Sequence, residues 1–347
     1  MKTTYLFFVS LFLLLSITSC TTEVKKEAVK KAEISDFLGQ WTIDVKGGGV
    51  SWLEVRQEKG YLDGDLLWIG GSVLPVADVF FNGTDKLIVT QNDIVVRTKD
   101  EKEQPLRSQT LTSWLEVERS GDKIKGYKLQ PKGDGTGVDS AAFTGTKLIA
   151  PPPAPDLSKL KFGKPVELFN GKDLTGWKLT EEKLKNGFYV ADGILANNPA
   201  QTEGQPHIQY GNLRTVDVFN DFNLKLEVNV PAGSNSGVYL RGLYEIQVLD
   251  SYKKELDPHN MGAVYSRIKP VVAAEKPAGT WQTLDITLCE RHITVILNGV
   301  KIIDNQPVYG PTGGAIISDV NSPGPIYLQG DHGVVSYRNF LLTPIIK

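Results

Sequence analysis

Four polar side chains, two of them carboxylates that could transfer protons, lie within the segment Asn235–Asp250: Arg241, Glu245, Gln247 and Asp250. Carboxylates transfer protons in catalysis, and a guanidinium stays charged and stabilises a developing anion. The segment otherwise alternates apolar and polar residues like two strands. Residues two apart in a strand share a face, so Glu245 and Gln247 are predicted to project together. Asp250 faces the other way unless a bulge turns it, and the polar face either meets solvent or lines a cleft.

Further polar and aromatic residues could complete such a cleft. Tyr239 has the same parity as Arg241 and is expected to point into it, whereas Asn235, Ser236 and Gly237 would present polar groups at its rim. Aromatic rings bind the apolar faces of flat ligands. The candidate platforms, of which Trp177 and Trp281 are equally expected in the core, are Trp177, Tyr239, Tyr244, Tyr265 and Trp281.

Histidine is scarce, so each of the four is informative. His332 stands in a tight turn beside Asp331, between two glycines, and is predicted to be functional. His259 follows the acidic strand in a loop from which it could reach the cleft. His207 and His292 are expected in a loop and at a surface turn.

The N-terminus predicts a lipid-anchored protein. Lys2 precedes an apolar run, Tyr5–Ile17, which is short for a permanent span and typical of a signal peptide. Small residues then lead to Cys20, as at a bacterial lipoprotein processing site, so residues 1–20 would be the signal and Cys20 the lipidated residue. A Lys- and Glu-rich tether, residues 21–33, would follow. We therefore expect attachment to the cell membrane or outer membrane, facing the periplasm or the exterior. Ordinary secretory cleavage is the alternative.

Bulk properties exclude several classes of function. The net charge is −2 and basic clusters are lacking outside the tether, which argues against nucleic acid as a partner. With Cys20 lipidated, Cys289 has no disulfide partner, and two cysteines cannot build a cysteine zinc site. The 347 residues can hold two domains, separated by the stiff Pro-rich linker at 150–163.

Short strands and turn signals predict an all-β protein. In residues 34–149 the turn signals Asn82-Gly83 and Gly121-Asp122 separate short strands, which favours an antiparallel β-barrel-like domain or a small sandwich. In residues 164–347 the run Phe222–Val230 alternates cleanly and Asn298-Gly299 is a strong hairpin signal. A last strand, Val335–Thr343, would return beside the first and close an antiparallel β-sandwich.

Four segments follow one another in the second half of the chain. They are VELFNGKDLTGW (Val166 to Trp177), NSGVYLRGLYEIQVLD (Asn235 to Asp250), the Asn298-Gly299 hairpin and IYLQGDHGVVSYRNF (Ile326 to Phe340). Taken together they resemble the 3-keto-disaccharide hydrolase family, over roughly Lys164 to Pro344. The resemblance implies a concanavalin-like sandwich (a jelly roll) that acts on oxidised sugars, and a functional link to a sugar-oxidising enzyme that supplies them.

The chemistry implied by this resemblance is β-elimination. A ketone at C3 acidifies the hydrogen on C2, a base removes it, the C1 substituent departs, and water adds back. The expected base is Glu245 or His332, with Asp250 behind one of them. The remaining expected groups are Arg241 and Arg338 for the anion, and Gln247, Gln329, Asp331, Tyr239, Asn235 and His259 for the substrate.

Two further possibilities concern metals and conventional glycosidases. Glu245, Asp250, Asp331 and His332 are ligand types for a divalent ion that polarises the ketone, although no spacing fixes such a site and a structural calcium is the alternative. The acidic strand also resembles the acid–base strand of glycosidases on this fold, but it carries Gln247 where they carry an acid. A two-carboxylate mechanism through this strand alone is therefore not expected.

Two rival functions stay open. A non-catalytic glycan-binding lipoprotein would use the same face without forming product, and it would keep its affinity in Glu245→Gln. A conventional glycoside hydrolase would cleave unmodified glycans and be indifferent to oxidation at C3.

Overall fold

The computed structural model describes residues 32–83 and 85–346. The predicted signal peptide, Cys20 and most of the tether lie outside these residues. Within the described part, no helix has the length and apolar character needed to cross a membrane.

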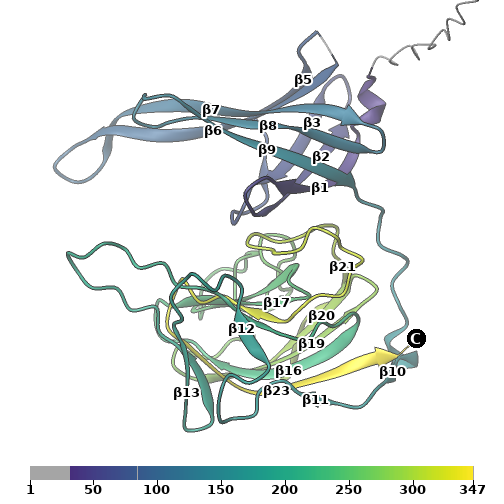
Figure 1. Cartoon of the computed structure of the whole chain (residues 1–347), viewed down its shortest axis with the longest axis vertical. Helices are drawn as coiled ribbons and strands as arrows, with labels where there is room; N and C mark the ends of the chain where they lie inside the picture. The colour runs from purple at the N-terminus through teal and green to yellow at the C-terminus, as the bar shows by residue number, and fades with distance from the viewer. Residues whose placement is uncertain (1–31, 84, 347) are drawn as a thin grey trace, which may run out of the picture. The chain divides into compact units, whose positions relative to one another are not determined.

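The first part of the described chain is a closed antiparallel barrel, one of the two forms that the sequence predicts (Figure 1). Strand β2 pairs with both β1 and β3, and β9 pairs with β1, so the sheet closes on itself. After the short 3-10 helix η1 (Ile34–Asp36), the strands are β1 (Gly39–Val45), β2 (Val50–Gln57), β3 (Leu62–Leu67), β4 (Leu74–Pro75), β5 (Asp78–Phe81), β6 (Lys86–Lys99), β7 (Pro105–Ser120), β8 (Lys123–Pro131) and β9 (Val138–Lys147).

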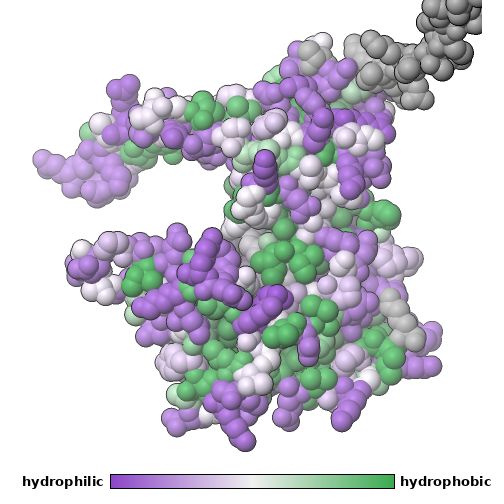
Figure 2. Space-filling model, viewed as in Figure 1, coloured by the Kyte–Doolittle hydropathy of each residue, from purple (hydrophilic) through white to green (hydrophobic). Residues whose placement is uncertain are grey.

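The barrel interior is filled by apolar side chains. Trp41, Leu53, Leu87 and Val117 are among a cluster of buried residues contributed by most of the strands. Inward residues alternate with outward ones along the strands of a barrel, and here the inward side chains form a hydrophobic core. Strands β6 and β7 continue beyond the barrel as a ribbon, whose tip is hydrophilic in Figure 2.

The second part of the described chain is an antiparallel sandwich of two sheets. One sheet runs β13-β14-β23-β16-β19-β20-β21, with β10 and β11 paired to β23, and the other runs β12-β15-β22-β17-β18. After the 3-10 helix η2 (Leu157–Lys159), the strands are β10 (Lys161–Phe162), β11 (Val166–Glu167), β12 (Trp177–Leu179), β13 (Phe188–Ala191), β14 (Ile194–Asn197), β15 (Leu213–Thr215), β16 (Phe222–Asn229), β17 (Asn235–Leu240), β18 (Tyr244–Leu249), β19 (Trp281–Cys289), β20 (His292–Leu297), β21 (Val300–Pro307), β22 (Tyr327–Leu328) and β23 (Val335–Ile346).

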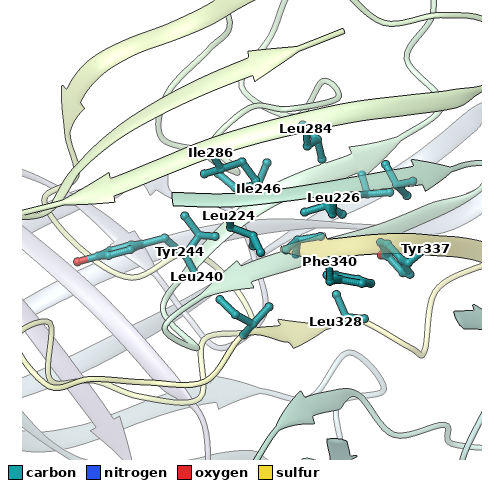
Figure 3. Packing of buried hydrophobic residues seen from close by; sticks show 14 of the residues in the cluster. Leu224, Leu226, Leu240, Tyr244, Ile246, Leu284, Ile286, Leu328, Tyr337 and Phe340 are labelled. Atoms are coloured by element: carbon teal, nitrogen blue, oxygen red, sulfur yellow. The ribbon is translucent and has the colours of Figure 1, made fainter. Parts of the chain in front are cut away.

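Alternation along the strands explains how the two sheets meet. In β16 every second residue is buried, as the sequence predicts. Figure 3 shows Leu224 and Leu226 of this strand packed with Ile246 and Leu328 of the other sheet. Burying such apolar surface contributes about 25 cal/mol per Å² and is the main force that holds the sheets together.

The two predicted landmarks of the sandwich are present. Asn298 and Gly299 have φ values of 52° and 83° and connect β20 to β21, as a two-residue hairpin turn requires. The last strand, β23, pairs with β11 and with β16, so the end of the chain lies beside its first sandwich strands. The prediction of an all-β chain with an antiparallel sandwich in its second half is therefore confirmed.

Candidate functional site

Glu245 lies in β18, on the face of its sheet that points away from the core. Its strand neighbours Tyr244 and Ile246 belong to the core, and it stands directly opposite Tyr239 of β17. Only 3% of Glu245 is exposed, and its backbone N–H donates to the Thr312 hydroxyl at 2.9 Å. On the facing strand, a Cβ at Gly237 would lie 2.3 Å from Glu245 Oε1. A glycine is therefore what leaves room for the carboxyl group.

Burial determines the protonation state of this carboxyl. Loss of water raises the pKa of Glu245 to about 8, although the Tyr239 hydroxyl opposes the shift. The Tyr239 oxygen lies 2.8 Å from Glu245 Oε2 and 2.7 Å from the Gly313 carbonyl oxygen. The carbonyl can only accept, and the hydroxyl has one proton. Both contacts are satisfied at once when Tyr239 donates to Gly313 and a protonated Glu245 donates to Tyr239.

Stacked rings hold Tyr239 in place. The rings of Tyr239 and Tyr327 lie 3.9 Å apart between centroids and nearly parallel, and the Tyr327 hydroxyl donates to the Gly314 carbonyl at 2.9 Å. Both rings are almost fully buried. Tyr239 therefore supports the carboxyl from a fixed position and is too buried to serve as an open platform for a sugar ring.

His332 and Asp331 form a second polar pair near Glu245. His332 Nδ1 lies 2.8 Å from Asp331 Oδ1, and both side chains are about half exposed. Asp331 raises the pKa of His332, and the charge of Glu245 raises it further. In return, the charge on His332 lowers the pKa of Glu245. The two groups therefore belong to one electrostatic site, with a buried carboxyl and a more accessible imidazole.

Asparagines fix the turn that carries this pair. Asn197 Nδ2, in β14, donates to the carbonyls of Gly330 and Gly333, at 3.0 Å each. Asn212 Oδ1 accepts from the Gly330 backbone N–H at 2.8 Å. Sequence reasoning missed both asparagines and Thr312, because a residue that positions others through the backbone leaves no local pattern.

Amide side chains supply further polar groups on the same face. Gln247 stands opposite Gly237, two residues after Glu245, as the strand parity predicts. Gln329 follows β22, and its backbone N–H donates to the Gly237 carbonyl at 3.0 Å. The side-chain oxygens of Gln329 and Asn235 are buried without a hydrogen-bond partner among the described residues. Buried polar atoms normally have partners, so these oxygens are candidates for bonding a ligand.

Two sequence candidates, Arg241 and Asp250, make their contacts away from Glu245. Arg241 sits in the β17–β18 turn with φ of 57°, and its guanidinium donates to the carbonyls of Val320 and Ser322. Asp250 Oδ2 accepts from the Gly233 backbone N–H, on the opposite side of the strand from Glu245. Among the described contacts, none joins either residue to Glu245.

Arg338 points away from the site. It lies in β23 of the other sheet, paired with Glu227 and stacked over Trp281 at 4.0 Å. Glu227 faces outward from β16, so this group is on the outer surface of that sheet. The expectation that Arg338 meets the cleft is corrected by this geometry. Strand parity indicates a face but not which of two sheets the strand joins.

The remaining candidates divide between core and surface. The two ring nitrogens of His259 form hydrogen bonds with Asp257 and Ser72, and its ring packs edge-on against Tyr265. No described contact joins His259 to Glu245. His207 is exposed, as expected, but His292 is 4% exposed and bonded to the Glu290 carbonyl, so its surface assignment was wrong. Three further candidates are buried in the core: Trp177, Tyr244 and Ser236.

The expected metal ligands do not gather. Among the described residues, no group of three or more His, Cys, Asp or Glu side chains is close enough to hold a metal ion. Asp250 bonds a backbone amide, and Asp331 bonds His332. The described residues therefore do not fit a protein-bound metal.

Comparison with known proteins assigns the sandwich to a class. A family model described as a 3-keto-alpha-glucoside-1,2-lyase-like domain matches residues 164–343, just over half of the chain. The sandwich and its polar site, taken with this match, define a carbohydrate-processing protein. The chain belongs to the 3-keto-alpha-glucoside-1,2-lyase-like family.

Several solved structures are similar to the chain. One presumptive glycosyl hydrolase of Parabacteroides distasonis is 27% identical, over 55% of this chain and 92% of that one, with a TM-score of 0.43. A second from the same organism is 22% identical, over 51% and 92%, with a TM-score of 0.42. A Bacillus licheniformis β-glucanase is 12% identical, over 55% and 99%, with a TM-score of 0.36. At these scores the likeness adds nothing to the strand pairing described above. The comparison with curated proteins returned no match.

Proposed function

We propose that the sandwich cleaves 3-keto-glycosides by β-elimination followed by hydration. The observation that carries this proposal is a buried carboxyl, Glu245, with a pKa of about 8, electrostatically coupled to the His332–Asp331 pair. A carboxylate with a raised pKa is a stronger base than an ordinary one. It suits removal of a C–H proton that a neighbouring ketone has acidified.

In the elimination step, ionised Glu245 takes the proton from C2 of the sugar. The electron pair of the broken C2–H bond forms the C1–C2 double bond, and the bond from C1 to the leaving oxygen breaks. Protonated His332 gives its proton to that oxygen, which leaves as an alcohol. The enolate character that develops on the ketone oxygen requires hydrogen-bond donors, and we assign this role to the side-chain amides of Gln247 and Gln329.

Hydration then restores both groups. Water adds to C1, neutral His332 takes a proton from that water, and protonated Glu245 returns a proton to C2. The net reaction is hydrolysis of the glycosidic bond. Asp331 holds the imidazole through Nδ1, which leaves Nε2 for the transfers.

The same residues disfavour the two-carboxylate mechanism. Gln247 supplies an amide where a second acid would stand, and Asp250 is directed to the Gly233 amide. Asp331 is the other carboxylate that influences Glu245, and it is bonded to His332. A single base with a histidine acid matches elimination better than it matches paired carboxylates.

The proposal extends to cellular context. The N-terminal segment that ends at Cys20 supports a lipid-anchored protein in the cell membrane or outer membrane. Its substrate must come from an enzyme that oxidises the C3 hydroxyl of a glycoside to a ketone. Globomycin-sensitive processing and labelling of Cys20 with a fatty-acid analogue would test the anchor, and a soluble, unlabelled product would contradict it.

The direct test compares a 3-keto-glucoside with its unoxidised parent, in D₂O and with and without a chelator. Release of the aglycone from the keto form alone, with deuterium incorporated at C2, is the expected result. Glu245→Gln should abolish both signals, and Arg338→Gln is the matched control because Arg338 lies on the outer face of the other sheet. Cleavage of the parent without exchange at C2 would indicate a conventional glycosidase. Binding without release from either compound would favour a glycan-binding protein.

A further inference from the structure

A cavity of about 230 Å³ lies where two hairpin turns of the sandwich meet. Its wall includes Arg241 from the β17–β18 turn, and Glu290 and Arg291 from the β19–β20 turn. Asp221, at the start of β16, and Asn321 complete the polar part of the wall. The groups of the Glu245 site are not among its lining residues, so this is a separate place in the fold.

The backbone around the cavity is strained. Glu290 and Arg291 have φ values of 49° and 62° in the two-residue connection between Cys289 and His292. This turn type favours Asn-Gly, and the chain uses Asn298-Gly299 for it in the next hairpin of the same sheet. Arg241, with φ of 57°, is a third bulky residue in the left-handed region. Backbone strain of this kind is common at ligand sites, where it holds side chains in the positions that binding requires.

The two arginines of the wall are buried and are held by backbone carbonyl groups. Arg241 is 2% exposed and Arg291 is 6% exposed. Carbonyl groups of Val320 and Ile149 hold them in place, at 2.8 Å and 2.7 Å respectively. Arg291 Nε is buried without a hydrogen-bond partner among the described residues. A buried donor normally has an acceptor, and the Tyr244 hydroxyl interacts with the Arg291 side chain from the core.

The charges of the wall restrict the kind of ligand that the cavity could bind. Two guanidinium groups face two carboxylates, those of Asp221 and Glu290. An anion would meet the carboxylates and a cation would meet the guanidinium groups. A neutral ligand rich in hydroxyl groups suits both, because each hydroxyl donates and accepts. Pro152 and Val320 add apolar surface to the wall.

We propose that this cavity is a second saccharide site, which binds one neutral monosaccharide unit. Its volume is below the roughly 300–1,000 Å³ of pockets for drug-sized ligands, which suits a single sugar ring. Arg241 and Arg291 donate to the oxygens of the sugar, and Asp221 and Glu290 accept from its hydroxyls. The site binds without reacting, so it does not depend on the catalytic proposal for Glu245.

The test titrates the full-length protein with glucose, galactose, mannose and xylose, followed by saturation-transfer NMR and calorimetry. The Glu245→Gln background prevents turnover and should leave this binding unchanged. We expect Arg291→Gln to weaken binding at least tenfold, and Arg338→Gln, on the outer surface of the other sheet, to leave it unchanged. Inorganic phosphate, the charged probe, should neither bind nor compete.

A second variant separates loss of the site from loss of the fold. Asn321 is exposed at the cavity wall, so Asn321→Trp should fill the space, abolish binding and leave the melting temperature unchanged. The proposal is overturned if none of the sugars binds, if binding survives both Arg291→Gln and Asn321→Trp, or if phosphate binds in preference to every sugar.

Discussion

Replacing Gly237 by alanine tests the site more sharply than removing Glu245 itself. The added methyl would lie 2.3 Å from Glu245 Oε1, 2.8 Å from Cδ and 2.9 Å from Cγ. The φ angle of Gly237 lies outside the left-handed region, so alanine suits the backbone and the effect comes from the contact alone. Glu245 must move by about an ångström, and the buried carboxyl then leaves its place beside Tyr239.

The magnitude follows from two general effects. Overpacking a buried position costs about 1–3 kcal/mol of folding stability. Misplacing a reacting group by about 1 Å lowers the rate by roughly 10²-fold. We therefore expect Gly237→Ala to fold with a lower melting temperature and to release aglycone from a 3-keto-glucoside about a hundred times more slowly. The assay is release in a single-turnover experiment, with circular dichroism for the fold.

A matched control and a rescue complete this experiment. Gly133 also lies outside the left-handed region and has nothing within 4 Å of an added Cβ, so Gly133→Ala should be silent. In Gly237→Ala the shorter side chain of Glu245→Asp should relieve the clash, so the two changes should be non-additive. If Gly237→Ala releases aglycone at the unmodified rate, Glu245 is not the reacting base.

Three other predictions concern protons and the turn. Since Glu245 must be ionised and His332 protonated, the plot of kcat/KM against pH should be bell-shaped, with one of its two apparent pKa values near 8. The fall should disappear in His332→Asn, and its persistence would place the acid elsewhere. The folded-state pKa of Glu245 lies above its unfolded value of 4.5, so stability should decrease as pH rises from 4.5 to about 8, by on the order of 4 kcal/mol. Urea unfolding of Glu245→Gln should lack this pH-dependent loss, and an identical slope in both proteins would refute the raised pKa. Asn197→Ala removes bonds to the Gly330 and Gly333 carbonyls, which should cost roughly 1–3 kcal/mol in the same unfolding assay and slow release of the aglycone. Unchanged stability and rate would show that the Gly330–Gly333 turn does not need Asn197 for its conformation.

Strand periodicity and turn signals were enough to predict most of the fold and which face of its strand Glu245 occupies. Alternation predicted that Glu245 and Gln247 share a face and identified β16, and the Asn-Gly pair identified the hairpin at Asn298-Gly299. These features depend on neighbours within one or two residues. They can therefore be predicted from the local sequence.

The errors arose where tertiary contacts decide the outcome. Strand alternation puts Arg241 on the same face as Tyr239. Its backbone is in the left-handed region instead, and its side chain bonds the Ser322 carbonyl. Arg338 faces outward because its strand joins the other sheet, and His292 is covered although it follows a turn. Asn197 reaches the Gly330 turn across more than a hundred residues, a pairing that no local pattern encodes.

The single proton of Tyr239 ties the chemistry to the loop around Gly313. While Glu245 is protonated, Tyr239 can donate to the Gly313 carbonyl, and this bond fastens the loop. When Glu245 ionises, the carboxylate becomes the stronger acceptor and draws the Tyr239 proton to itself. The loop then loses that fastening until a proton returns. In the proposed elimination, the proton that Glu245 takes from the sugar frees the Tyr239 proton to bond the Gly313 carbonyl again, so the catalytic cycle and the attachment of the loop are coupled.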